Sequence, residues 1–305
     1  MDRLESMSTL LAVVDAGSLS AAARRLKTPL TTVSRRVAEL EAHLKTRLLT
    51  RSSRRVALTD AGRSYVAACK RILEELGEAE RAAAGEYSAP TGDLLVAAPV
   101  VFGRLHVLPI AIEFLRAYPD IDIRLRLADS IVNILEEPVD LAVRIGHLPD
   151  SSLLARRVGV IRRVICASPA YFAERGTPRE PADLGTHDCI TFEGMTAPEA
   201  WTFTTGGSES TVAIRSRLVV NTAEAAIDSA KAGVGITRVL SYQAASAARE
   251  GALVLALQDF EPSPLPVNLV HVGQRLLPQK LRAFLDFATP RLKARIVEAT
   301  LPDPC

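Results

Sequence analysis

The sequence lacks the features that mark membrane and secreted proteins. No stretch of the chain approaches the roughly 18–20 apolar residues that cross a bilayer. The first segment carries acids at Asp2 and Glu5 and has no long apolar run, so it does not resemble a signal peptide. We therefore expect a cytoplasmic protein with no membrane partner.

Cysteine and histidine are sparse and scattered. The four cysteines are Cys69, Cys166, Cys189 and Cys305, and no two of them stand in a C-x-x-C motif. The five histidines, His43, His106, His147, His187 and His271, show no spacing typical of a metal site. We expect reduced thiols, no metal and no cofactor. A redox switch between Cys166 and Cys189 remains an alternative.

Catalytic signatures are missing as well. The motifs G-x-S-x-G, H-E-x-x-H and G-x-x-x-x-G-K-[ST] do not occur. The stretch GVGITR at 233–238 contains the first two glycines of a dinucleotide-binding motif but not the third. We therefore do not expect an enzyme.

The basic residues are unevenly distributed along the chain. The net charge of the 305 residues is only +2, but residues 1–58 hold 11 Lys and Arg against 5 Asp and Glu. The remainder holds 26 basic and 30 acidic residues. A basic N-terminal part on a mildly acidic body indicates that this end meets a polyanion.

The basic part contains two short amphipathic helices joined by a tight turn. Leu19, Ala22, Ala23 and Leu26 form one apolar stripe, and the second stripe consists of Leu30, Val33, Val37, Leu40 and Leu44. Thr28 is the expected N-cap of the second helix, and Pro29 suits its first turn. The pattern predicts a helix-turn-helix.

The outer face of the second helix carries short polar side chains and arginine. Thr31, Thr32 and Arg35 point away from the apolar stripe, and Ser34 and Arg36 lie on its flanks. Such a helix can sit in a DNA groove, where arginine binds a guanine or a phosphate. The alternative is an ordinary solvated surface helix.

Residues 51–58 read as a two-stranded wing with a basic tip. Arginine stands at positions 51, 54 and 55, beside Val56 and Leu58. We expect these arginines to contact phosphates of the DNA backbone. A charged surface hairpin without a ligand is the alternative.

A long helix is predicted from Asp60 to about Glu86. Its apolar residues repeat every 3.5 positions, as in a coiled coil, and are Tyr65, Cys69, Ile72, Leu76, Ala79 and Ala83. We interpret it as a dimerisation helix. The alternative is packing against the chain's own second domain.

Beyond the linker at 87–94, strands alternate with helices over about 200 residues. Strands are expected at LLVAAP, IDIRLRLA, VDLAVRIG, 164–167, 212–214, 217–220 and LPVNLVHV. Helices are expected at 104–119, 223–232, 242–249 and 278–296. This is an α/β body large enough for two lobes.

Taken together, these segments resemble a LysR-type bacterial transcriptional regulator. SLSAAARRL, TTVSRRVAELE and RLLTRSSRRVALTDAG resemble the family's helix-turn-helix, wing and linker helix. VDLAVRIGHLPDSSLLARRVG, ASPAYFAERGTP, AGVGITRVLSYQ and LLPQKLRAFLDF resemble the regulatory domain of the subgroup often called CrgA-like. The solute-binding proteins that share such a two-lobed body carry a signal peptide and no basic winged helix.

The resemblance implies an α/β fold with three parts. These are a winged helix-turn-helix at 1–59, a linker helix at 60–87 and a regulatory domain at 88–305. The regulatory domain would have two Rossmann-like lobes, as in periplasmic binding proteins, with lobe I at about 93–162 and 266–305 and lobe II at about 163–265. The implied partners are promoter DNA with inverted repeats, a small-molecule effector between the lobes, further copies in a homodimer or homotetramer, and RNA polymerase.

The resemblance also assigns site residues. Thr31, Ser34 and Arg35 match base-contacting positions, and Arg51 and Arg54 match phosphate contacts of the wing. The effector would contact the loop at 99–103, which is apolar here, and residues further along the chain. The full set of effector candidates is Val100, Val101, Phe102, Gly103, Asp129, Ser130, Arg144, Gly146, Trp201, Asn221 and Thr237.

Overall fold

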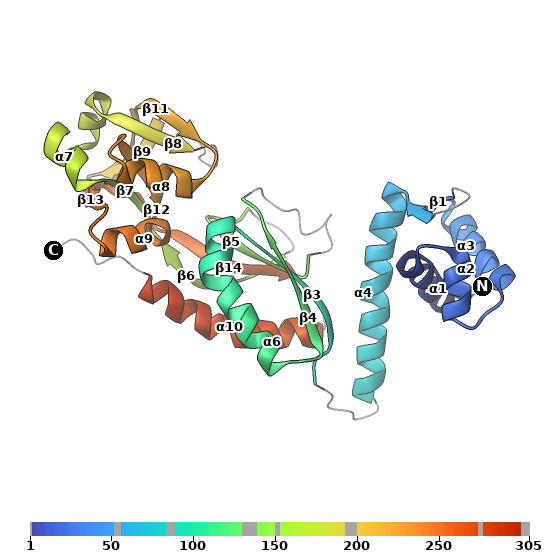
Figure 1. Ribbon diagram of the computed structural model, residues 1–305. Coiled ribbons are helices and arrows are strands. Elements are labelled where there is room, and N and C mark those ends of the chain that lie inside the picture. The colour runs from blue at the N-terminus through green and yellow to red at the C-terminus, as the bar shows by residue number, and fades with distance from the viewer. Residues whose placement is uncertain are drawn as a thin grey trace.

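The computed structural model describes most of the chain. The described residues are 2–51, 56–83, 89–129, 139–149, 153–192, 200–273 and 277–299. Figure 1 shows a small helical unit at the N-terminus, a long helix beside it, and a two-lobed α/β body. The expected fold class is therefore confirmed.

The N-terminal unit is a winged helix-turn-helix. Its elements are α1 (Arg3–Ala16), α2 (Leu19–Arg25), α3 (Leu30–Leu44), β1 (Leu49–Arg51) and β2 (Val56–Leu58). The two strands pair antiparallel and form the wing. Asp2 and Ser18 cap α1 and α2 through their side chains, and Gly17 ends α1 with a left-handed φ of 69°. The apolar faces of all three helices meet in one core.

The start of α3 differs from the expectation. Thr28 is not the N-cap, because its hydroxyl donates to the carbonyl of Leu26 at 3.1 Å and so closes the preceding turn. Pro29 takes the cap position without a side-chain hydrogen bond, and the helix begins at Leu30. Leu30, which we placed on the apolar stripe, is 49% exposed because it lies at the free end of the helix.

The first turns of the linker helix α4 (Asp60–Ala83) pack against the N-terminal unit of the same chain. Val66 and Cys69 are buried, and α4 contacts α1 and β2 (Figure 1). Along the predicted seam, Tyr65 and Cys69 therefore face α1, whereas Ile72 is 43% exposed. The side chains of Ala79 and Ala83 lie outside the described residues. Only the later part of the seam is thus open to a partner helix.

Lobe I is built on a five-stranded mixed sheet in the order β4-β3-β5-β14-β6. The strands are β3 (Gly92–Ala98), β4 (Ile121–Leu127), β5 (Leu141–Ile145), β6 (Leu153–Ile161) and β14 (Leu265–Val272). The chain after β3 forms α5 (Val100–Phe102), a π-helical turn η1 (Gly103–Val107) and α6 (Leu108–Ala117). With α10 (Gln279–Glu298), these helices bury the main core of the lobe (Figure 1).

Lobe II has a second five-stranded sheet in the order β11-β8-β12-β7-β13. Its strands are β7 (Arg163–Ala167), β8 (Asp188–Phe192), β11 (Arg215–Val220), β12 (Ile236–Leu240) and β13 (Val254–Ala256). The hairpin of β9 (Ala200–Thr205) and β10 (Ser208–Ala213) covers one face. The helices are α7 (Pro169–Arg175), η2 (Pro181–Thr186), α8 (Ala223–Lys231), α9 (Ser241–Arg249) and η3 (Gln258–Phe260).

Two crossovers connect the lobes, one from β6 to β7 and one from η3 to β14. Arg162 on the first crossover and Glu261 on the second lie 3.5 Å apart, from Nε to Oε2, with both side chains largely buried. The amide of Ser241 donates to the carbonyl of Arg162 at 2.9 Å and ties α9 to the same point. The junction between the lobes is therefore a packed, hydrogen-bonded structure.

No single described helix is long and apolar enough to cross a membrane. Helices α1 and α2 together have the length and apolar composition of a membrane span, but the chain bends by 113° between them.

Gly62 sets how closely α4 approaches the wing. A Cβ added there would overlap the carbonyl oxygen of Leu48, which is backbone and cannot swing away. We expect Gly62→Ala to lower the free energy of unfolding by about 1–3 kcal/mol, although alanine favours helices intrinsically. Urea unfolding measures this change. Gly185→Ala is the control, because its Cβ would meet no atom within 4 Å; equal effects of the two changes would contradict the prediction.

Candidate functional site

The outward face of α3 is the first candidate site. Thr31 is exposed, Thr32 and Ser34 are half-buried, and the side chain of Arg35 is 66% exposed. Arg35 Nη1 donates to Glu39 Oε1 at 3.0 Å, one turn further along the helix. Such an exposed pair contributes only about 0.3–0.5 kcal/mol, so the guanidinium is easily released to a DNA base or phosphate. The helix therefore presents the predicted chemistry to solvent.

Arg36 is held differently from Arg35. Its side chain is only 22% exposed and donates a hydrogen bond to Glu5 on α1. The pair connects α3 to α1, two helices that pack against each other. This contact favours a role for Arg36 in positioning the recognition helix, and its assignment to DNA stays a prediction.

The wing is positioned by an acid that the sequence did not single out. Glu41 on α3 accepts hydrogen bonds from the amides of Leu48 and Leu49 at 2.8 and 3.0 Å and so fixes β1 against the helix. The backbone of Arg51 pairs with Val56 in the wing. Arg54 and Arg55 lie outside the described residues, so the phosphate contacts stay predictions.

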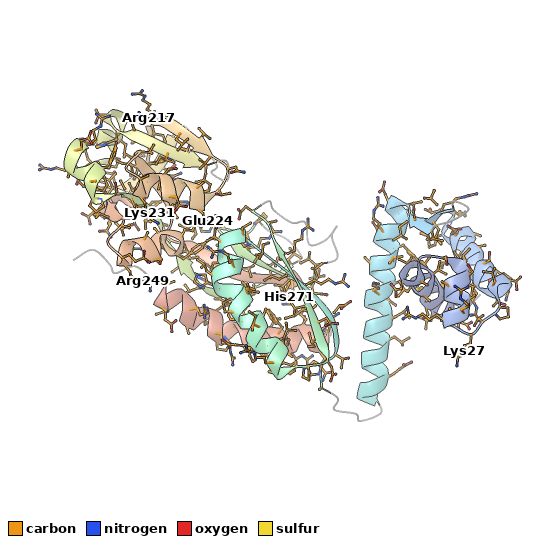
Figure 2. All side chains as sticks on the ribbon, in the orientation of Figure 1. Lys27, Arg217, Glu224, Lys231, Arg249 and His271 are labelled. Carbon is orange, nitrogen blue, oxygen red and sulfur yellow. The ribbon has the colours of Figure 1, made fainter. Side chains whose placement is uncertain are left out.

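A basic side chain at the turn was also missed. Lys27, between α2 and α3, adopts a left-handed φ of 50° and projects away from the unit (Figure 2). Its charge adds to the exposed Arg24 and Arg25 at the end of α2. The dense basic run at the turn was the signal in the sequence that could have identified it.

The second candidate site, at the end of β3, differs from the expected loop. Val100–Phe102 already form a helical turn, and the helix expected at 104–119 begins at Val100. Val101 and Phe102 are buried in the lobe I core. Gly103 is enclosed as well, because a Cβ there would overlap Leu127 Cδ2. Val101 and Phe102 therefore support the core, and the contact of this loop with an effector stays a prediction.

Asp129 explains why this helix starts where it does. Its Oδ1 accepts the amide of Val100 at 3.0 Å, which satisfies one of the free N–H groups at the helix start. A carboxylate at this position disfavours a bound anion beside it. The geometry therefore argues against an anionic ligand at these N–H groups. Ser130, the neighbouring candidate, lies outside the described residues.

Arg144 and Gly146 lie at the end of β5. Arg144 is inside the strand, and partial burial lowers the pKa of its guanidinium. Gly146 has a φ of 119°, and its amide donates to Pro266 at 2.9 Å. Their contact with an effector stays a prediction.

Two of the effector candidates in lobe II are core residues. Trp201 is completely buried, and its side chain packs with Phe203 in the core between the β9–β10 hairpin and the sheet. Thr237 is also fully buried, and its hydroxyl donates to the carbonyl of Ile190 at 3.1 Å. Asn221, directly after β11, is exposed and remains available.

The structure adds a small pocket at the lobe junction that sequence reasoning missed. It is lined by Phe102, His106, Val160, Ile161, Ser241, Tyr242, Ile296 and Ala299. The π-helical turn brings His106 into this pocket, where its ring lies 4.7 Å from Phe102 and 5.6 Å from Tyr242. Neither ring nitrogen has a hydrogen-bond partner among the described residues. Arg104 of lobe I and Glu224 of lobe II lie 3.8 Å apart and connect the lobes; Glu224 is labelled in Figure 2.

The cysteines that could have formed a redox switch are inert. Cys166 and Cys189 are fully buried on strands β7 and β8, and β12 lies between these strands. Burial raises the pKa of each thiol to about 12, so neither is a thiolate at neutral pH. Within the described ranges, no group of His, Cys, Asp and Glu is arranged to hold a metal.

Two family models match the chain. Residues 4–63 match the "Bacterial regulatory helix-turn-helix protein, lysR family" model, and residues 88–293 match the "LysR substrate binding domain" model. A transcriptional repressor of Pseudomonas aeruginosa is 34% identical over 289 residues, which cover 94% of this chain and 91% of the relative.

Two solved structures extend the comparison. CrgA from Neisseria meningitidis, a LysR-type transcriptional regulator, is 30% identical with a TM-score of 0.61. The full-length Vibrio cholerae virulence activator AphB is 26% identical with a TM-score of 0.59. Each comparison covers 94% of this chain and 98% of the other. The likeness includes both the winged unit and the two lobes.

His106 makes the stability of the protein depend on pH. The ring is 6% exposed, and burial together with the charge of Arg295 lowers its pKa from 6.5 to about 4. The unfolded chain therefore takes up a proton at a higher pH than the folded chain, and stability falls as the pH drops below 6.5. We expect this group to cost about 2 kcal/mol of the unfolding free energy between pH 7 and pH 5.

Urea unfolding of the wild type and of His106→Leu at both pH values isolates this contribution, because other groups titrate equally in both proteins. His43→Gln is the control, since His43 is exposed. An identical pH dependence in wild type and His106→Leu would show that the imidazole does not carry the effect.

Proposed function

Because the chain belongs to the LysR family and is a DNA-binding transcriptional regulator, we propose that it binds interrupted inverted repeats near promoters with paired copies of α3. The observation that carries this proposal is the exposed face of α3, where Thr31 and the weakly held Arg35 stand on a strongly basic unit. A helix with short hydroxyl side chains can approach base edges in the major groove closely.

The proposal gives each part of the chain a task. Residues 1–59 bind DNA, 60–87 join two copies, and 88–305 bind an effector, with lobes at about 93–162 plus 266–305 and at 163–265. Thr31, Ser34 and Arg35 read bases, while Arg51, Arg54 and Arg55 contact phosphates. The protein is not an enzyme, and its regulatory domain is of the CrgA-like type.

The exposed part of α4 supports self-association. Tyr65 and Cys69 are used within the chain, so Ile72 and the turns after it form the surface for a second α4. Pairing through α4 gives a dimer, and contacts between regulatory domains extend it to a homotetramer on two operator sites. RNA polymerase would then be contacted by the assembled protein at the promoter.

A small-molecule effector in the cleft between the lobes is the proposed signal. Two separate sheets joined by two crossovers form the kind of body in which such ligands bind between the lobes. Among the candidates, Asn221 is exposed, and Arg144 and Gly146 lie together at the end of one strand. Binding there would change the angle between the lobes and thereby the spacing of the paired DNA-binding units.

Arg35 provides the direct test of base reading. We expect Arg35→Ala to lower operator affinity by about 1–3 kcal/mol and to relax the preference at one base position, because a bidentate contact to a base is lost. A gel-shift titration of the chain's own upstream DNA and of single-base variants measures both effects. Arg116→Ala, an exposed arginine on α6, is the control.

Arg54→Ala separates base reading from phosphate binding. It should weaken binding to every sequence alike and reduce the slope of log affinity against log salt by roughly one unit. If Arg35→Ala behaves in this way instead, Arg35 contacts a phosphate and the base assignment is wrong.

Ile72 tests the dimer helix. Ile72→Glu would place an unpaired carboxylate in an apolar seam, which costs several kcal/mol. We expect loss of the dimer in light scattering and of tight binding to a two-half-site operator. Val254→Glu, an equally exposed valine on β13, should leave the oligomer intact. A full-size oligomer for Ile72→Glu would contradict the assignment of α4.

A further inference from the structure

Two arginines stand next to each other on neighbouring strands of lobe II. In the antiparallel register of β7 and β12, Arg238 pairs with Ile165 and Leu240 pairs with Arg163. Paired residues share a face of the sheet, as do alternate residues of one strand. Arg163 and Arg238 are therefore diagonal neighbours on one face, within reach of each other's long side chains.

The hairpin β9–β10 covers this face and encloses Arg238. The guanidinium carbon of Arg238 lies 5.4 Å from the centre of the Trp201 ring, and Nη1 donates to the carbonyl of Thr202 at 3.4 Å. Trp201 is fully buried, and its indole N–H has no acceptor among the described residues. Arginine over the face of tryptophan is a favourable cation–π arrangement, but it does not neutralise the charge.

The charge of the two arginines is not balanced by a bonded acid. In the described part of the chain, neither guanidinium forms an ion pair or a hydrogen bond with a carboxylate, although both side chains are half-buried. The acid that acts on Arg163 is Glu209, an exposed residue of β10 at a longer range. The adjacent Arg162, in contrast, has Glu261 at 3.5 Å.

Burial lowers the pKa of both guanidinium groups. The positive charge of Arg163 lowers the pKa of Arg238 further, to about 10. Both groups therefore remain positive at neutral pH. Two desolvated like charges without a bonded counter-ion are unfavourable in a folded protein. A fold that keeps them side by side is complementary to a ligand of opposite charge.

The position of the pair restricts what can reach it. Arg163 begins β7 directly after the crossover from β6, so the pair lies at the end of lobe II that adjoins lobe I. Leu240, on the same face, packs against the core of lobe I. A site at this junction, partly covered by a hairpin, suits a small molecule rather than a protein or a nucleic acid.

We propose that Arg163 and Arg238 form an anion site that binds the carboxylate or phosphate group of a small molecule at the lobe junction. Guanidinium groups bind both kinds of oxyanion through paired N–H···O bonds. That this molecule is the regulatory effector rests on the proposed function, whereas the binding itself does not.

Trp201 is the single tryptophan of the chain and lies against Arg238, so its fluorescence reports on the site. The full-length protein is titrated with sodium phosphate in one series and with sodium acetate in another, against sodium chloride at equal ionic strength. We expect a saturable change in tryptophan emission and a rise in melting temperature with one of the two oxyanions, but not with chloride. The series that responds identifies the class of ligand.

Arg163→Gln is the decisive variant, because Arg163 lies at the start of a strand and its change disturbs the core least. We expect the affinity for the oxyanion to fall about tenfold or more, as for loss of a charged hydrogen bond. We also expect the anion-free variant to melt at a higher temperature than the wild type, since the repulsion is removed. Arg163→Lys should retain part of the binding, and Arg179→Gln, an exposed arginine of lobe II, should retain all of it.

Several results would overturn the proposal. These are no saturable response to either oxyanion, unchanged binding in Arg163→Gln, or a lower melting temperature for the anion-free variant, which would make Arg163 a structural residue. A gel shift on the same preparations keeps the two proposals separate. If operator DNA is bound while no oxyanion is, the anion site is wrong and the proposed function stands.

Discussion

The winged helix-turn-helix and the linker helix depend on the packing of α1. Leu10 and Val13 are fully buried, and they share one core with Val33 and Val37 of α3 and with Val66 of α4. One helix therefore holds the recognition helix on one side and the linker helix on the other (Figure 1). Because interiors are close-packed, a change in the position of α4 is transmitted to α3 rather than absorbed. In the proposed dimer, the distance between the two recognition helices would follow from this contact.

In the regulatory domain, the contacts at the lobe junction hold the two lobes together. The buried pair of Arg162 and Glu261 joins the crossovers, and His106 packs against Tyr242 beside them. Several unusual groups meet here in the described part of the chain: an imidazole with no hydrogen-bond partner among the described residues, a π-helical turn, and two arginines with no bonded acid among those residues. Departures of this kind from the usual rules of burial are typical of functional sites. The junction is thus the part of the domain best suited to respond to a small molecule.

The sequence predicted those elements whose signal is local. The spacing of Val33, Val37 and Leu40 predicted α3, and the mostly apolar run LPVNLVHV predicted β14 with its observed bounds. Strand β6 was not predicted as a strand from its pattern, because its burial follows from pairing with β14, more than a hundred residues away, and shows no simple alternation. The N-cap at Pro29 was missed since Thr28 uses its hydroxyl on the preceding turn.

The site residues likewise fall into those that local helical geometry predicts and those that depend on contacts between remote segments. The exposure of Thr31 and Arg35 follows from helical geometry and was predicted correctly. The pairing of Arg36 with Glu5, and the burial of Trp201, depend on contacts between remote segments, which one sequence does not reveal. For the same reason, neither His106 nor the juxtaposition of Arg163 and Arg238 could be recognised before the strands and helices were placed together.

The central claim is that two α3 helices, held at a fixed distance through α1 and α4, read two half-sites. Affinity measured against half-site spacing tests it most directly, with an operator selected from random DNA and lengthened in single base-pair steps. The account predicts that affinity falls sharply when about 5 base pairs are inserted and recovers in part at about 10, one helical turn, because both helices must face the same side of the duplex. An affinity that does not vary with spacing would contradict it.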